Sequence, residues 1–96
     1  GQIAINPATG NVEATDIVGQ SKQVMANLKA VLEAAGTSFD KVVKTTCFLK
    51  DVARDFGAFN EVYAEAMGDA KPARSCVGVA DLPKGVLVEV EVIAAL

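Results

Sequence analysis

Four residues on two short apolar segments could carry the chemistry of this chain. Arg74 and Cys76 lie two residues apart, and so do Glu89 and Glu91. Side chains alternate along a β-strand, so each pair shares one face of its strand. A guanidinium presents a planar fork that grips both oxygens of a carboxylate. A glutamate can position or deprotonate a water molecule. These residue types suit a site for a small carboxylate.

Structural roles compete with each of these assignments. Arg74 could form an ion pair with Glu89 or Glu91, and glutamates are common on solvated strand faces. Cys76 could be a nucleophile, but the chain has no histidine to activate it. A small, buried wall residue is the commoner role for such a cysteine.

Asn60 and Gly1 are two further candidates. Asn60 interrupts the apolar stripe of an expected helix, where it could face a site or cap a neighbouring backbone group. Gly1 could present its backbone N–H group or could simply end a strand.

Metal binding is not expected. Histidine is absent, and the two cysteines, Cys47 and Cys76, lack the close spacing of a zinc site. Reduced thiols in an intracellular protein are favoured over a disulfide.

Length and composition indicate one domain over residues 1–96, with an N-terminal strand apparently missing. Hydrophobic residues make up 51% of the chain, an excess that predicts a homo-oligomer. The net charge is −3 and the nine basic residues are scattered, which argues against nucleic acid as a partner. No apolar run approaches the ~20 residues of a membrane span, so no membrane association is expected. A cytoplasmic location is expected, with a mitochondrial one left open.

Periodicity and turn residues predict two helices and three strands after an initial strand end and a turn at residues 6–10. A helix should run from Asp16 to Ala35, with Gly36 ending it and Gln20 on its wet side. Asp55 is expected to cap the second helix. The strands are expected at residues 41–50, 73–80 and 86–95.

This order predicts an α+β fold, with one mixed sheet and two helices on one face. Val86, Val88, Val90 and Val92 should pack under the helices. The face that carries Arg74 and the glutamates should look away from the helices, towards another subunit. If the last two strands pair as a hairpin, Cys76 falls close to Glu89 or Glu91.

The whole chain resembles the RidA/YjgF family, the reactive-intermediate deaminases. The most specific match is Pro-Ala-Arg-Ser at residues 72–75 with the downstream pair Glu89 and Glu91. The other matching segments are residues 1–3 with 6–7, 27–28 with 33–36, 42–46, 55–56 with 60–63, and 82–85.

The resemblance implies a chorismate-mutase-like fold and a homotrimer with a barrel-like core, with sites between neighbouring subunits. It also implies a cofactor-independent enamine/imine deaminase. Such an enzyme hydrolyses 2-iminobutanoate and 2-iminopropanoate to 2-keto acids and ammonia.

Carried over by position, the resemblance assigns Arg74 to the substrate carboxylate and Glu89 to the attacking water. It places Gly1, Asn60 and Cys76 in the substrate cleft. A tyrosine that lines this cleft in the family lies before the first residue of this sequence.

Two other functions stay open. One is a non-catalytic regulatory protein that binds a small carboxylate such as a 2-keto acid, for which Arg74 alone would suffice. The other is an RNA-directed activity, which the acidic composition and the absence of a basic patch disfavour.

Overall fold

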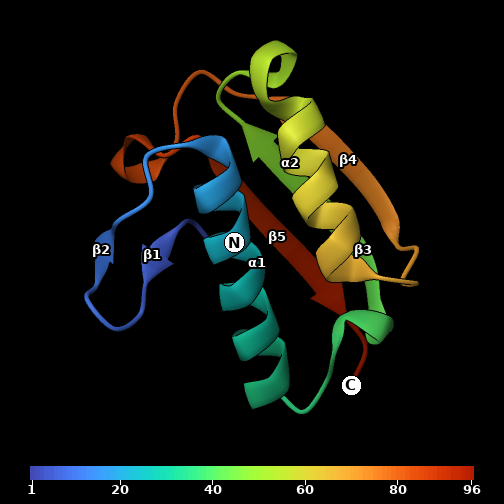
Figure 1. Ribbon diagram of the computed structural model, residues 1–96. Coiled ribbons are helices and arrows are strands. Elements are labelled where there is room, and N and C mark those ends of the chain that lie inside the picture. The colour runs from blue at the N-terminus through green and yellow to red at the C-terminus, as the bar shows by residue number, and fades with distance from the viewer.

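The computed structural model describes all residues, 1–96. Two helices lie side by side on one face of a three-stranded sheet (Figure 1). The α+β prediction is therefore confirmed. Neither helix is long and apolar enough to cross a membrane. The elements are β1 (Ile5–Asn6), β2 (Asn11–Val12), α1 (Ile17–Ala34), β3 (Val42–Leu49), α2 (Val52–Met67), β4 (Ala73–Gly78) and β5 (Val88–Ala94).

Helix α1 has the predicted bounds. Asp16 is its N-cap residue, and Gly36 follows the C-terminal end with a φ of 83°, a conformation that glycine adopts without steric cost. Gln20, however, is buried, so the prediction that it lies on the solvent-exposed side of the helix is wrong. Its amide donates to the carbonyl of Ala14 and accepts from the backbone N–H of Leu87, so it ties α1 to the approach to β5.

Helix α2 begins earlier than predicted. Asp51, not Asp55, is the N-cap residue, and its carboxylate accepts a hydrogen bond from the backbone N–H of Arg54 at 3.0 Å. Asp55 lies inside the first turn and is buried, where Arg54 pairs with its carboxylate at 2.8 Å. Both aspartates suit a helix N-terminus, so composition alone did not separate them.

The sheet has the order β4-β3-β5, with β3 parallel to β4 and antiparallel to β5. The expected hairpin between the last two strands is therefore wrong. Strand β3 holds the centre, where both of its edges are hydrogen-bonded, and its Thr45, Cys47 and Leu49 are completely buried. A hairpin of β4 and β5 would leave one edge of this apolar strand without a partner.

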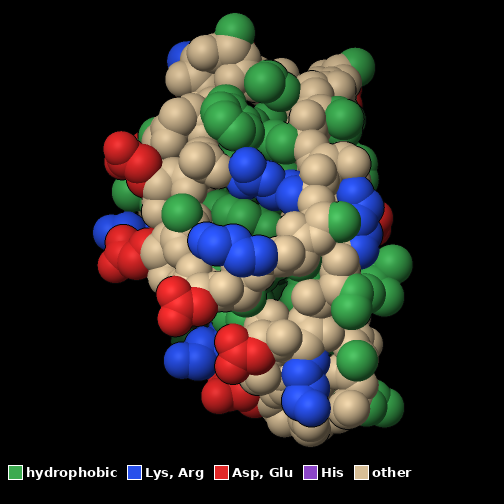
Figure 2. Space-filling model, turned by 90° about the vertical axis from the view of Figure 1, so that its right-hand side faces the viewer, with side chains coloured by type: hydrophobic (Ala, Val, Ile, Leu, Met, Phe, Trp, Pro, Cys, Tyr) green, Lys and Arg blue, Asp and Glu red, His purple; other side chains and the backbone are tan.

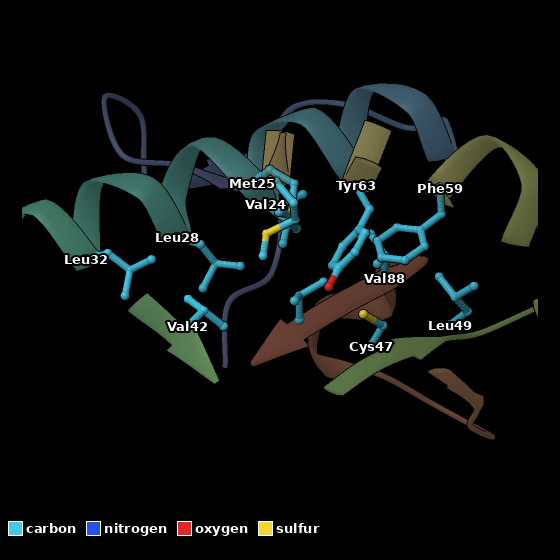
Figure 3. Packing of buried hydrophobic residues seen from close by; sticks show 13 residues of the cluster. Val24, Met25, Leu28, Leu32, Val42, Cys47, Leu49, Phe59, Tyr63 and Val88 are labelled. Carbon is cyan, nitrogen blue, oxygen red and sulfur yellow. The ribbon is translucent and has the colours of Figure 1, made fainter. Parts of the chain in front are cut away.

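The core lies between the helices and the sheet, and Figure 3 shows its side chains meeting there. Val86, Val88 and Val90 are buried as predicted, whereas Val92 is only half-buried. The register of β3 and β5 shifts between Val42 and Lys44. This irregularity buries Val42 and leaves its neighbour outside, so strict alternation fails at the start of β3. The buried apolar cluster comprises Ala4, Val24, Met25, Leu28, Leu32, Val42, Cys47, Leu49, Phe59, Tyr63, Met67, Val88 and Val90.

Candidate functional site

Arg74 lies on the helix-facing side of β4, against α2. Its Nη1 donates a hydrogen bond to Oδ1 of Asn60 at 2.7 Å. The guanidinium carbon lies 4.6 Å from the ring centre of Tyr63 and 5.6 Å from that of Phe56. An aromatic face attracts a cation at these distances. Three side chains of one helix therefore orient the guanidinium.

The charge of Arg74 has no acidic partner within the chain, where the one ion pair joins Arg54 and Asp55. Structural pairing of Arg74 with a glutamate is thus excluded inside one chain. Arg74 borders a hollow of about 260 Å³ between α2 and the start of β4, which Lys71 also lines. Figure 2 shows this side of the molecule, with basic side chains lying over an apolar floor.

Cys76 lies two residues along β4 from Arg74 and is partly buried against the core. It is aligned with Cys47 of β3 in the parallel register. Burial raises the pKa of the Cys76 thiol, while Arg74 acts in the opposite direction. A thiol with a raised pKa is a poor nucleophile at neutral pH, so a covalent catalytic role for Cys76 is disfavoured.

Glu89 and Gly1 form a second group. The backbone of Gln2 exchanges two hydrogen bonds with Val90, at 2.8 and 3.0 Å, which places the first residue beside β5. A Cβ atom on Gly1 would collide with Oε2 of Glu89. A side chain at position 1 would therefore force the carboxylate of Glu89 to shift. Glu89 is partly buried, whereas Glu91 is exposed.

These two groups lie on opposite faces of the sheet, which corrects the expectation that Arg74 and the glutamates share a face. Val88 and Val90 point into the core, so Glu89 between them points away from the helices. Lys44 donates to Ser75 at 2.7 Å on that same outer face, and Arg74 therefore points inward. Strand alternation fixes faces within one strand but not between two strands.

Tyr63 and Phe56 are neighbours of Arg74 that were not predicted from the sequence. They follow the spacing i, i+4, i+7 with Asn60 and so share one face of α2. This spacing is the signal that could have identified them. Tyr63 belongs both to the core and to the surroundings of Arg74: its hydroxyl shares a hydrogen bond of 2.9 Å with the buried Thr45, and its ring faces the guanidinium.

A larger groove of about 510 Å³ lies between α1 and α2 and contains none of the predicted site residues. Its walls include Met25, Phe39 and Val62, with Lys22 and Lys29 at the side of α1. The candidate site is therefore defined by side-chain chemistry and not by size.

The model of one protein family, described as Endoribonuclease L-PSP, matches residues 1–96. This chain belongs to that family, the RidA/YjgF family. A RutC family protein of Pyrococcus horikoshii is 54% identical over 94 residues, which cover 98% of this chain and 74% of the relative.

Solved structures of the RidA/YjgF family share the fold. A Rid family protein of unknown function from Yersinia pestis is 48% identical, with a TM-score of 0.96, over 100% of this chain and 76% of its own. TdcF of Escherichia coli, crystallised with bound serine, is 41% identical with a TM-score of 0.92 over the same shares.

The buried thiol of Cys47 predicts a loss of stability in alkaline solution. Burial, reinforced by Cys76, raises its pKa from 9.0 to about 11. The folded state keeps the proton more tightly, so this contribution is complete below pH 9 and is lost as the pH rises towards 11. The free energy of unfolding should fall by about 2 kcal/mol over this range through Cys47.

Urea unfolding of wild type and Cys47→Ala between pH 8 and 11 measures this effect, since other groups titrate equally in both proteins. The curve of the variant should be flatter than that of wild type. Parallel curves would contradict the assignment.

Proposed function

We propose that this protein hydrolyses 2-imino acids and their enamine tautomers, such as 2-iminobutanoate and 2-iminopropanoate, to 2-keto acids and ammonia. One observation carries the proposal. Arg74 is held by Asn60 and two aromatic rings, has no acidic partner and borders a hollow. A restrained cation with unused N–H donors suits the carboxylate of a small acid.

The chemistry needs few groups. The carbon of a protonated imine is already electrophilic, so the protein has only to hold the carboxylate and direct a water molecule. Arg74 would hold the carboxylate. Glu89 would accept a proton from the water as it adds to the carbon, and would return the proton to the nitrogen that leaves as ammonia.

Arg74 and Glu89 lie on opposite faces of the sheet, so one chain does not assemble this site. We propose a homotrimer in which Arg74, Asn60 and Cys76 of one copy meet Gly1 and Glu89 of the next. The outer sheet face supports association, because it leaves apolar side chains exposed beside Glu89. Val43, Val77 and Ile93 are 56%, 43% and 63% exposed.

The relatives support a small ligand. Serine, bound in the crystals of the E. coli relative, has a carboxylate beside a nitrogen-bearing carbon, as a 2-imino acid does. The family description names an endoribonuclease instead. A net charge of −3 favours a small acid over RNA, whose binding rests on many cationic contacts to phosphate.

Replacing Glu89 separates the deaminase from a regulatory protein that only binds a carboxylate. Glu89→Gln should abolish most turnover but keep affinity for 2-oxobutyrate, since glutamine is nearly isosteric yet accepts no proton from water. Glu91→Gln is the matched control and should have a milder effect. A deamination assay coupled to a dehydratase, beside calorimetric titration with 2-oxobutyrate, measures both properties.

Three other outcomes would redirect the proposal. Normal turnover by Glu89→Gln with an inactive Glu91→Gln would exchange the roles of the two glutamates. Full turnover in both would exclude base catalysis by β5. If wild type binds 2-oxobutyrate but shows no turnover, the protein is a regulatory carboxylate-binding protein and not a deaminase.

A further inference from the structure

The two cysteines of the chain are direct neighbours across β3 and β4. Cys47 and Cys76 are aligned in the parallel register, and both point to the helix side of the sheet. Adjacent strands lie about 4.8 Å apart, which is within the range of Cα separations, about 4.4 to 6.8 Å, that a disulfide spans.

The two thiols differ in access. Cys47 is completely buried, and Figure 3 shows its sulfur in the core near Tyr63. Cys76 is partly exposed on the same strand as Arg74. A small oxidant therefore reaches Cys76 before Cys47, and Cys47 is the neighbour of Cys76 on the adjacent strand.

We propose that Cys76 and Cys47 form an oxidisable pair that closes to an intramolecular disulfide with hydrogen peroxide. The deprotonated form of Cys76, a minor fraction at neutral pH because burial raises the pKa of its thiol, attacks peroxide and becomes a sulfenic acid, with release of one water. The Cys47 sulfur then displaces the second water, and the S–S bond forms. Two thiols are oxidised by two electrons, and one peroxide is reduced to two waters.

Reductants should reopen this bond. A disulfide needs Cβ atoms about 3.5 to 4.5 Å apart, a separation that side chains on the same face of adjacent strands approach. Cys76 is partly exposed, so an external thiol can attack the bond and reduce it. The pKa of Cys47, raised to about 11, keeps it protonated at neutral pH, so closure should accelerate as the pH rises.

The effect of the bond on turnover rests on the proposed function. Closure would bond the sulfur of Cys76 to that of Cys47, two residues along β4 from Arg74. If Arg74 and Cys76 line the substrate site, oxidation should cause a loss of deaminase activity that dithiothreitol restores.

Mass spectrometry of the whole protein after exposure to peroxide tests the bond itself, with dimedone present to trap sulfenic acid. Wild type should lose two hydrogens and take up no dimedone. Trypsin should then release residues 45–50 linked to residues 75–84, and the denatured protein should run as a single chain without reductant. Cys47→Ala is the matched control and should carry one dimedone on Cys76.

Each result decides one point. Dimedone on Cys76 of wild type, a link between two chains, or no change in mass would overturn the pairing. The peptide map of wild type decides even if the variant folds poorly. A disulfide in a protein that never deaminates would leave the pair established and the proposed function wrong. Full activity without a disulfide would do the reverse.

Discussion

Arg74→Lys is expected to lower kcat/KM about 30- to 900-fold, which corresponds to a loss of about 2–4 kcal/mol in transition-state stabilisation. Lysine keeps the positive charge but offers a single ammonium in place of the planar fork. It also cannot stack in the same way on Tyr63, which lies 4.6 Å from the guanidinium carbon. Steady-state kinetics of imine hydrolysis, with circular dichroism to check folding, measures the effect.

Arg54→Lys is the matched control for this experiment. Arg54 is also an arginine on the surface at α2, but it pairs with Asp55 and takes no part in the hollow beside Arg74. Its replacement should leave kcat/KM within about twofold of wild type, since lysine keeps the positive charge beside Asp55 and position 54 lies outside the hollow. A folded Arg74→Lys protein with the turnover of wild type would remove Arg74 as the carboxylate anchor.

Two inactive variants should restore activity when their chains are combined. If each site joins Arg74 of one copy to Glu89 of the next, a mixed trimer of Arg74→Lys and Glu89→Gln chains contains some sites with both native residues. In a ring of three chains, every mixed trimer contains one such site out of three, so the purified mixed species should have about one third of the wild-type activity. Co-expression with two affinity tags, followed by kinetics of the mixed species, measures the recovery.

Mixing the two purified proteins without exchange of chains is the control and should give no recovery. Co-expression of two differently tagged Arg74→Lys chains should also stay inactive. If confirmed mixed trimers have no more activity than either variant, Arg74 and Glu89 do not meet between copies. Arg74 and Glu89 would then belong to separate sites, and the proposed shared site would be wrong.

Both helices, the three strands of the main sheet and most of the candidate residues could be predicted from the sequence. Hydrophobic spacing and Gly36 defined α1, and the valines of β5 predicted its buried face, of which Val88 and Val90 are completely buried. These features depend on contacts between near neighbours and on local backbone preference. The spacing of Arg74 and Cys76 likewise fixed their common face within β4, because alternation is a property of a single strand.

The order of the strands and the relative orientation of their faces could not be predicted from the sequence, because both depend on how the whole chain folds. The tertiary structure inserted β3 between β4 and β5, turned Arg74 towards α2 and turned Glu89 to the opposite side. It also brought Cys47 beside Cys76, which the sequence separates by 29 residues. The physical reason is that strand order and facing depend on which arrangement buries the most apolar surface while pairing every edge of the central strand. Burial and edge pairing depend on contacts made across the whole chain, so the sequence of a single segment does not determine them.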